Sequence, residues 1–366
     1  MEKKILFLSP LPPPFGGIAS WTQILVDKGF PPSFSIKIIN TGVPADRIAF
    51  ESYKINLKEI KRNIKIVVNL FSVLRKEPIA LAHLNCSLSL LGLFRDWLCT
   101  LIIRCYKVPL VLHLHGNFKP KNSLEKRFYN AMFSRSSAII VLNKNSFKSV
   151  DMLGEFASKC CILPNFIEIT SMPQKAIKSK VDSFNLIFVG WIAREKGILT
   201  ILEVAKRLPK VKVTLVGETT REISKILDEL LRNPINQVRI EITGRLSKPE
   251  VIKRLLNADV FILPSYTEGF PCSVAEAMAC GLPILASPVG AIPDMIENGK
   301  GGYLIESQDV DGYVKALLRL MEDKPLRDSM GTYNKLKAYS EYDYAVVIKK
   351  LCELYDSVLC NYAKKE

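Results

Sequence analysis

The stretch DVFILPSYTEGFPCSVAEAMACGLP, residues 259–283, decides the fold class. Its first part, Asp259–Ser265, is an apolar, β-branched run typical of a strand buried on both faces of a parallel sheet. Ser273–Cys280 has the makeup of a short helix that ends at Gly281 and Pro283. The stretch therefore predicts a strand, a loop and a helix, the unit from which α/β folds are built.

This pattern places two carboxylates at one edge of the predicted sheet. Glu268 lies on the loop that leaves the strand's carboxyl end, and Glu276 lies on the helix that follows. Ligands of open α/β sheets bind at this edge. Two carboxylates beside the N–H groups of a helix start can hold a polyhydroxylated ligand. The alternative is that Glu276 is a solvated helix residue and Glu268 an ordinary loop charge.

Strand-like and helix-like segments alternate along nearly the whole chain, which predicts parallel sheets with crossover helices. In the first half the predicted strands are Lys4–Ser9, Phe34–Asn40, Ile79–Asn85, Leu110–His115, Ala138–Leu142 and Cys161–Leu163. In the second half they are Leu186–Gly190, Val211–Gly217, Val238–Thr243, Val260–Pro264, Ile284–Ser287 and Gly302–Ile305. A polar linker at 168–182 separates two doubly wound domains, 1–167 and 183–341, and a final helix lies in 342–366.

The composition is that of a globular protein in a reducing compartment. The 366 residues are 48% hydrophobic and 24% charged, and the nine cysteines form no C-x-x-C pair. The apolar run at the start is too short for the core of a signal peptide. The longest apolar region, Cys86–Val108, is interrupted by Arg95, Asp96 and Arg104, so we expect a buried or half-buried helix there and no membrane span. A cytoplasmic location follows from these observations.

Positive charge is concentrated in the first half of the chain. Residues 1–180 hold 26 Lys and Arg against 11 Asp and Glu, whereas residues 181–366 hold 25 of each. The excess favours an anionic partner. A basic cluster interleaved with apolar residues is the makeup of a helix that lies on a membrane surface, or of an ordinary surface helix with solvated lysines. Its residues are Lys54, Lys58, Lys61, Arg62 and Lys65, with Ile55, Leu57, Ile60, Ile64 and Ile66 between them. No motif of nucleic-acid binding is present.

Three turns carry candidate phosphate or base contacts. Gly16 and Gly17 open the helix after the first strand, where N–H groups and the helix dipole favour an anion, unless they form only a tight turn. Arg194 and Lys196 follow the strand Leu186–Gly190 and suit a diphosphate. The turn Thr243–Ser247, which contains Gly244, Arg245 and Leu246, could present its backbone to a base edge or be a plain turn.

Two further motifs have both a functional and a structural interpretation. His113 and His115 end a predicted strand before Gly116, and alternation sends both side chains to one sheet face. His115 is a candidate active-site residue or a hydrogen-bonded structural histidine. Asp309-Val310-Asp311 has the D-x-D form of some metal-diphosphate sites, but it directly precedes an amphipathic helix, so N-capping explains it better. We therefore expect no metal.

The ordered motifs together give the chain a family resemblance. They are Gly16-Gly17, His115-Gly116, AREKG at 193–197, TGRLS at 243–247, and EGFPCSVAEAMACGLPILASPVGAIPDMIENGKGGYLI at 268–305. With these, the chain resembles the retaining glycosyltransferases of family 4, of the type found in polysaccharide biosynthesis. The resemblance implies the GT-B fold, in which two Rossmann-like domains face a cleft. It also implies that the final helix, Tyr342–Leu359, returns to the first domain.

The resemblance implies a role for each candidate residue toward a UDP- or GDP-linked sugar donor. Glu276 would hold the ribose hydroxyls, and Glu268, with the backbone of Gly269, Phe270 and Cys272, the sugar. Lys196, with Gly16 and Gly17, would bind the diphosphate, and His115 would lie near the anomeric carbon. Where the family usually carries Arg, this chain has Trp191, and Arg194 could supply the charge.

The activity so implied is a metal-independent hexosyl transfer that retains the anomeric configuration and needs no cofactor. The acceptor would be a hydroxyl of a glycan or of a lipid-diphosphate-linked glycan. The basic first domain would contact anionic lipid on the inner face of the cell membrane. Three alternatives stay open: a catalytically degenerate nucleotide-sugar-binding protein, a nucleotide-sugar 2-epimerase, and a nicotinamide-dependent oxidoreductase, against which the missing glycine fingerprint speaks.

Overall fold

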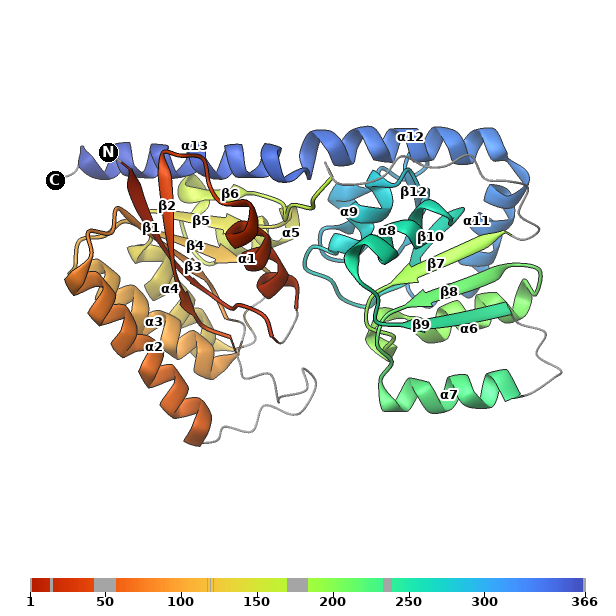
Figure 1. Cartoon of the computed structure of the whole chain (residues 1–366), viewed down its shortest axis with the longest axis horizontal. Helices are drawn as coiled ribbons and strands as arrows, with labels where there is room; N and C mark the ends of the chain where they lie inside the picture. The colour runs from red at the N-terminus through yellow and green to blue at the C-terminus, as the bar shows by residue number, and fades with distance from the viewer. Residues whose placement is uncertain are drawn as a thin grey trace. The chain divides into compact units, whose positions relative to one another are not determined.

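Two parallel six-stranded sheets organise the chain in the computed structural model, each with helices on both faces (Figure 1). The structure describes residues 2–13, 16–42, 57–87, 89–116, 118, 120, 122–169, 184–232 and 239–364. Residues 1–165 and 347–366 form unit 1, and residues 166–346 form unit 2. Most of the predicted linker, 168–182, lies outside the described residues, as do Lys54 and Ile55.

Unit 1 contains the sheet with the order β2-β1-β3-β4-β5-β6. Its elements are β1 (Lys3–Ser9), α1 (Gly17–Lys28), β2 (Phe34–Asn40), α2 (Leu57–Lys76), β3 (Leu81–Asn85), α3 (Leu90–Cys105), β4 (Leu110–Leu114), α4 (Ser123–Arg135), β5 (Ala138–Val141), α5 (Lys144–Asp151), η1 (Ala157–Lys159) and β6 (Cys160–Ile162). The last helix, α13 (Tyr344–Ala363), belongs to unit 1 from Val347 onward.

Unit 2 contains the sheet with the order β12-β11-β10-β7-β8-β9. Its elements are β7 (Asn185–Val189), η2 (Arg194–Lys196), α6 (Ile198–Arg207), β8 (Lys212–Val216), α7 (Arg221–Arg232), β9 (Arg239–Gly244), α8 (Lys248–Leu256), β10 (Val260–Leu263), α9 (Cys272–Ala279), β11 (Ile284–Ala286), α10 (Ile292–Met295), β12 (Gly302–Leu304), α11 (Val310–Glu322) and α12 (Lys324–Glu341). All twelve predicted strands are confirmed, and no end differs from the prediction by more than two residues.

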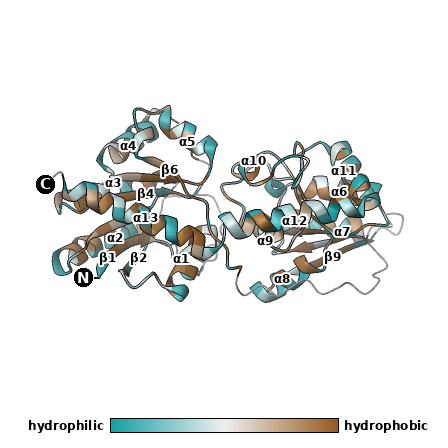
Figure 2. Ribbon diagram, turned by 90° about the horizontal axis from the view of Figure 1, so that it is seen from above, coloured by the Kyte–Doolittle hydropathy of each residue, from teal (hydrophilic) through white to brown (hydrophobic). Residues whose placement is uncertain are grey.

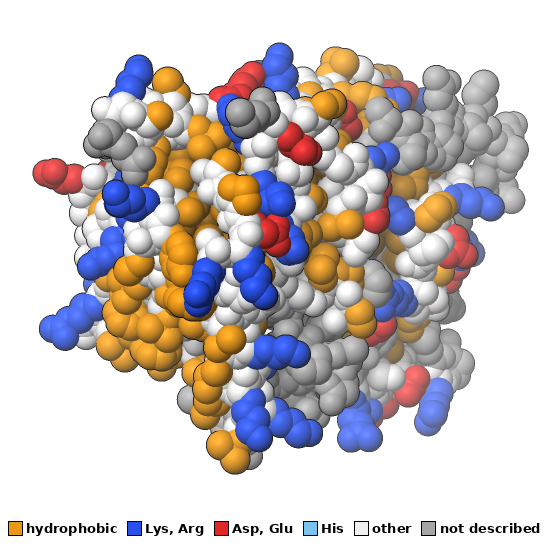
Figure 3. Space-filling view, turned by 60° about the vertical axis from the view of Figure 1, so that its left-hand side comes forward, with side chains coloured by type: hydrophobic (Ala, Val, Ile, Leu, Met, Phe, Trp, Pro, Cys, Tyr) orange, Lys and Arg blue, Asp and Glu red, His pale blue; other side chains and the backbone are white. Residues whose placement is uncertain are grey.

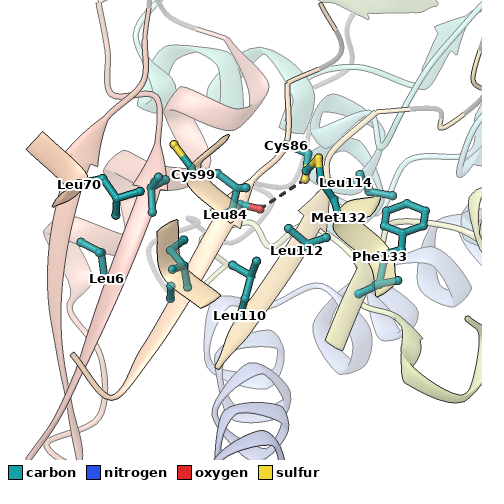
Figure 4. Packing of buried hydrophobic residues seen from close by; sticks show 14 of the residues in the cluster. Leu6, Leu70, Leu84, Cys86, Cys99, Leu110, Leu112, Leu114, Met132 and Phe133 are labelled. Carbon is teal, nitrogen blue, oxygen red and sulfur yellow. Dashed lines mark hydrogen bonds between the residues drawn. The ribbon is translucent and has the colours of Figure 1, made fainter. Parts of the chain in front are cut away.

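The two faces of the unit 1 sheet differ in chemistry. Because side chains alternate along a strand, Leu6, Leu84 and Leu112 point to one face, where they pack with residues of α2, α3 and α4 in the hydrophobic core (Figure 4). Phe7, His83 and His113 point to the other face, toward α1 and α13. Figure 2 shows the strands as mostly apolar and the helices around them as mixed in hydropathy.

The region Cys86–Val108 is confirmed as a helix, α3, which begins after the N-cap Ser89. Two of the three charges that interrupt its sequence, Arg95 and Asp96, are satisfied inside the protein, and Arg104 is exposed. Arg95 donates to Asp96 Oδ1 through Nη2 (2.7 Å) and Nε (2.9 Å), and both side chains are buried. Asp96 Oδ2 also accepts from the backbone N–H of Ser87 (2.7 Å). Within the described residues, no helix has both the length and the apolar character needed to cross a membrane.

Candidate functional site

Glu268 lies on the loop between β10 and α9, and neighbouring loops fix this loop. The backbone N–H of Tyr266 and the hydroxyl of Ser265 both donate to the Glu195 carbonyl, at 2.9 and 3.2 Å. On the other side, Gly290 has a left-handed φ of 59°, and a Cβ there would clash with the Glu268 carbonyl oxygen. The loops that follow β7, β10 and β11 therefore set the position of Glu268 together.

Lys196 forms an ion pair with Glu268, with Nζ 2.7 Å from Oε1. Lys196 ends η2, and Gly197 follows it with a left-handed φ of 72°. A Cβ on Gly197 would clash with the Pro264 carbonyl oxygen, so only glycine lets the two loops approach this closely. The Glu268 side chain is 8% exposed and that of Lys196 26% exposed. The structure thus brings together two residues that the sequence places 72 positions apart.

A second carboxylate–lysine pair joins α9 to α8. Glu276 is buried within α9, and its Oε1 accepts from Nζ of Lys248, the first residue of α8. The start of α8 is fixed by a capping box between Ser247 and Glu250. Sequence reasoning missed Lys248. The signal that could have found it is a basic residue directly after TGRLS, at the edge of the sheet where the other candidates lie.

The thiol of Cys272, the first residue of α9, lies within electrostatic reach of both glutamates and of Lys248. Burial raises the pKa of Cys272 to about 12, and the charge of Glu276 contributes in the same direction. Lys248 lowers this pKa and Glu268 raises it slightly. All these groups therefore lie within electrostatic reach of one thiol, which stays protonated at neutral pH. We call Glu268, Glu276, Lys196, Lys248 and Cys272 the carboxylate site.

The beginning of α9 adds backbone donors to the carboxylate site. Its first turn has no side-chain cap and no acidic residue, which leaves the helix start suited to an anion or a hydroxyl oxygen. The preceding residues are held in place, since the Gly269 carbonyl accepts from Ala291 N–H (2.9 Å) and the Phe270 ring packs on Tyr342 with centroids 5.4 Å apart.

The predicted arginines lie on the surface and have acidic partners. Arg194 Nε is 2.9 Å from Glu222 Oε1, and both side chains are 57% exposed. Arg245 is 3.8 Å from Glu218. Exposed ion pairs of this kind contribute little free energy. Either arginine can therefore leave its acidic partner and bind a ligand at little cost in free energy. A phosphate role for Arg194, in place of the arginine expected at Trp191, stays a prediction.

Glycines end three adjacent strands of unit 2. Gly190, Gly217 and Gly244 follow or close β7, β8 and β9, and all three have positive φ. Gly217 N–H donates to the Gly244 carbonyl (3.0 Å), and a Cβ on Gly217 would clash with the Gly190 carbonyl oxygen. The turn Thr243–Ser247 therefore begins where the ends of three strands are in close backbone contact. Leu246 in this turn is half-buried.

In unit 1, Gly16 is the N-cap of α1 and Gly17 its first residue. The helix start has no side-chain cap and no acidic residue in its first turn. Gly16 has extended backbone, and a Cβ added at either position meets nothing within 4 Å. The protein's own packing therefore does not demand glycine here. Open space beside exposed N–H groups fits the predicted contact with an anion.

His113 and His115 lie on the same face of the unit 1 sheet, as predicted. Their rings stack with centroids 3.7 Å apart. His115 Nε2 lies 2.9 Å from Asn85 Oδ1. Burial lowers the pKa of His115 to about 3, and contact with the Asn165 side chain acts in the opposite direction. His115 is therefore neutral at physiological pH, and it can donate or accept a hydrogen bond but carries no charge.

The D-x-D motif is an N-cap, as expected. The Asp309 side chain accepts from Gly312 N–H at the start of α11 (2.9 Å), and Asp311 pairs with Arg207. Among the residues that the structure describes, no group of three or more His, Cys, Asp or Glu is arranged to hold a metal ion.

Comparison with known proteins agrees with this geometry. Residues 173–337 match the sequence profile of the family Glycosyl transferases group 1. The chain is 24% identical over 332 residues to the UDP-Gal:alpha-D-GlcNAc-diphosphoundecaprenol alpha-1,3-galactosyltransferase of Escherichia coli, a match that covers 84% of this chain and 82% of the relative.

Two solved structures share the fold over almost the whole chain. Sucrose-phosphate synthase from Thermosynechococcus elongatus superposes with a TM-score of 0.77 at 16% identity, covering 98% of this chain and 100% of that chain. Anabaena HepE in complex with UDP and glucose superposes with a TM-score of 0.71 at 17% identity, covering 97% and 100%.

The fold is therefore that of the GT-B glycosyltransferases. Residues 173–337, which carry the carboxylate site, are the part of the chain that matches the model of Glycosyl transferases group 1. This match favours a transferase over the epimerase and the oxidoreductase.

Proposed function

We propose that this chain is a retaining, metal-independent hexosyltransferase that uses a UDP- or GDP-linked sugar. The observation that carries the proposal is the carboxylate site, in which two buried glutamates, each paired with a lysine, converge beside the uncapped start of α9. Carboxylates accept hydrogen bonds from sugar hydroxyls, and lysines bind phosphates. One nucleotide sugar satisfies both kinds of group at once.

We assign the groups along the donor in the order that the resemblance gives. Glu276 binds the ribose hydroxyls and Glu268 the hydroxyls of the transferred sugar. Lys196 binds the diphosphate, with Arg194 as a second cation. The roles of the start of α1 and of His115, both in unit 1, rest on the family resemblance alone.

The reaction then needs stabilisation of the leaving group. The bond between the anomeric carbon and the diphosphate oxygen breaks, and the acceptor oxygen forms a new bond to that carbon. The acceptor proton passes to the departing diphosphate. Negative charge grows on the diphosphate during this step, and Lys196 is placed to neutralise it. The two glutamates position the sugar and do not act as the acid and base of a hydrolase.

A lipid-diphosphate-linked glycan in surface polysaccharide assembly is the acceptor that we propose. The Escherichia coli relative carries such an acceptor, a diphosphoundecaprenol, in its name. In this chain the excess of positive charge lies entirely in residues 1–180. A lipid-bound acceptor requires the enzyme to reach the cytoplasmic membrane surface.

Helix α2 offers a surface for that contact. One stripe of the helix packs inward as part of the core, through Ile66, Leu70 and Val73. A second stripe faces solvent, and in it Ile64 is 58% and Val68 61% exposed. Lysines lie on the same helix and are exposed as well. We define the α2 surface as the apolar residues Leu57, Ile60, Ile64, Val68 and Phe71, at the spacing of one helix face, together with Lys58, Lys61 and Lys65.

The apolar surface continues beyond α2. Phe71 packs on Tyr106 with centroids 5.8 Å apart, and on α3 Leu90 and Phe94 are also exposed. Figure 3 shows hydrophobic side chains gathered on this part of the molecule with Lys and Arg around them. Apolar side chains bordered by lysines match an anionic bilayer, where each basic residue contributes about 1 kcal/mol. We propose that the α2 surface lies on anionic lipid.

The transfer itself tests the function. We would incubate the protein with a panel of UDP- and GDP-hexoses, with and without short-chain polyprenyl-diphosphate glycans, and follow nucleotide release. We expect one donor class to be consumed only when acceptor is present, and the product to keep the donor's anomeric configuration by NMR. A protein that binds the donor and transfers nothing to any acceptor would be a degenerate binding protein.

A further inference from the structure

Lys248 binds the carboxylate of Glu276, although no role for it follows from the sequence. It is the first residue of α8, and its Nζ donates to Glu276 Oε1 on α9. The resemblance assigns the ribose hydroxyls to Glu276 and gives this lysine no part in donor binding. A nucleotide that binds Glu276 nevertheless meets the Lys248 ammonium, because that group already lies on the carboxylate.

The backbone around Glu276 is fixed. Helix α9 is buried on both sides of this residue, at Ala275 and Ala277. Just after the helix, the Gly281 carbonyl approaches α12 so closely that a Cβ on Gly331 would clash with it. Asn334 of α12 also donates from Nδ2 to the Leu282 carbonyl (2.8 Å). The carboxylate therefore has a set position that a ligand has to reach.

The Lys248 side chain, in contrast, has room to move. Its backbone is held at the start of α8, where Ser247 N–H donates to Glu250 Oε2 (2.9 Å) in the capping box. The side chain itself is 44% exposed, against 10% for that of Glu276. A lysine ammonium on its flexible stem can turn and regain water when it leaves a carboxylate. Of the two partners, the lysine is thus the one that yields to a ligand.

The ammonium acts on the side of α9 that carries the carboxylate site. Cys272 lies one turn before Glu276, so the two side chains share a helix face. Burial raises the pKa of the Cys272 thiol to about 12, and the charge of Lys248 acts in the opposite direction. Lys248 is therefore close enough to this face to meet a ligand that binds there.

A hydroxyl group fits between an ammonium and a carboxylate. The ammonium only donates hydrogen bonds and the carboxylate only accepts them, whereas a hydroxyl does both. Both bonds are then charge-assisted, which makes them stronger than neutral ones. A carboxylate offers about four lone-pair positions on its two oxygens. The second hydroxyl of a vicinal diol can thus bind the same carboxylate.

We propose that Lys248 is a second ribose-binding residue of the donor site. A ribose hydroxyl enters between Lys248 and Glu276, donates its hydrogen to the carboxylate and accepts a hydrogen bond from the ammonium. The proposal rests on the function above, which places a ribose at Glu276. Lys248 then increases the preference for a ribonucleotide over a deoxynucleotide beyond what Glu276 gives alone.

Calorimetric titration with matched nucleotides tests this role. We would titrate UDP, GDP and ADP, each beside its 2′-deoxy and 3′-deoxy forms, and compare the ratio of dissociation constants, deoxy to ribo. We expect a ratio of about 100 for at least one deoxy form in the native protein, reduced about tenfold in Lys248→Met by the loss of one charge-assisted bond. An unchanged ratio would overturn the proposal.

The ratio separates a contact from a general effect of charge. A cation near the diphosphate strengthens the binding of both forms alike, so its removal leaves the ratio as it was. Equal weakening of both forms in Lys248→Met would therefore also overturn the proposal. Lys206→Met is the matched control, because it removes an exposed lysine that pairs with Glu203 on α6 (2.7 Å), and it should keep the native ratio.

A second variant guards against a defect peculiar to methionine. Serine is well accepted near a helix start, and its side chain is too short to reach Glu276. We expect Lys248→Ser to reduce the ratio as much as Lys248→Met, and the urea unfolding curve reports whether each variant folds. A native ratio in a folded Lys248→Ser would contradict the contact.

Failure of the proposed function gives a different result. If the native protein binds none of the nucleotides, the donor site itself is wrong and the role of Lys248 falls with it. If the native protein binds one of them and Lys248→Met keeps the native ratio, only the role of Lys248 is wrong. A native protein that binds the ribo and both deoxy forms equally well overturns the role of Lys248 as well.

Discussion

Two buried glutamates have different roles in this account, although their surroundings look alike. Each accepts from a lysine, and each is 8% exposed. Glu268 lies on a loop fixed by three strand ends, whereas Glu276 lies within a helix. The lysine partners differ in exposure, 26% for Lys196 and 44% for Lys248. A hydroxyl of the ligand can therefore displace the lysine more easily at Glu276 than at Glu268.

Replacement of Glu268 tests the assignment to the transferred sugar. We expect Glu268→Ala to lower kcat by about 10²–10³, the range for a lost transition-state contact, and to change nucleotide affinity by less than about threefold. Lys196 stays available for the diphosphate in this variant. Turnover and calorimetric nucleotide titration provide the two readings.

Glu203→Ala is the matched control, because it removes an exposed carboxylate on α6 that pairs with Lys206 outside the carboxylate site. We expect it to leave both readings nearly unchanged. Equal losses of turnover and nucleotide affinity in Glu268→Ala would contradict a sugar-facing role.

At the scale of elements, the sequence predicted most of the secondary structure and part of the site. The strands were predictable because strands buried on both faces are continuous apolar runs bounded by turn residues. The N-cap at Asp309 and the positions of the two carboxylates were also predictable, because they follow from residues next to them in the sequence. Lys248 was not, since it acts on a residue far away in the sequence, 28 positions on at Glu276. Local patterns do not contain such pairings.

Helix α2 is a second case in which the local sequence pattern could not decide between two interpretations. The alternation of basic and apolar residues left an interfacial helix and an ordinary surface helix equally acceptable. The structure adds that two apolar stripes exist: one packs in the core, and the other, on the α2 surface, is exposed. An ordinary surface helix needs only the first.

Substitution on α2 tests the membrane contact. We expect Ile64→Ser with Val68→Ser to reduce co-sedimentation with anionic vesicles about tenfold or more, because two exposed apolar side chains no longer enter the lipid. Lys61→Gln with Lys65→Gln should reduce binding at low salt and have less effect at high salt.

Leu336→Ser is the control for the loss of an exposed leucine, since Leu336 is 68% exposed on α12 of unit 2. It should bind vesicles as the native protein does. If the native protein fails to co-sediment with anionic vesicles at low salt, the α2 surface has another role.

At the scale of the whole molecule, the buried histidines make stability depend on pH. Burial lowers the pKa of His83 and His115 to about 3, and that of His113 well below its usual range. Between pH 6.5 and 3 the unfolded chain binds protons at these sites and the folded chain does not. The free energy of unfolding therefore falls as the pH falls through this window.

Urea unfolding at a series of pH values measures this dependence. We expect unit 1 to lose roughly 2–3 kcal/mol between about pH 6.5 and 5.5 for three histidines. In a Trp191→Phe background the two remaining tryptophans, Trp21 and Trp97, both report on unit 1. Stability that stays constant across this pH range would show that the histidines are not held neutral.

The central claim is that the carboxylate site of unit 2 holds the nucleotide of a sugar donor, and calorimetric titration tests it most directly. We would titrate the native protein and Glu276→Gln with UDP, GDP, ADP and their common sugars. The account predicts binding of one nucleotide class, weakened about 10- to 100-fold in Glu276→Gln by the loss of charge-assisted bonds to the ribose. Binding of no nucleotide, or equal affinity in the variant, would contradict it.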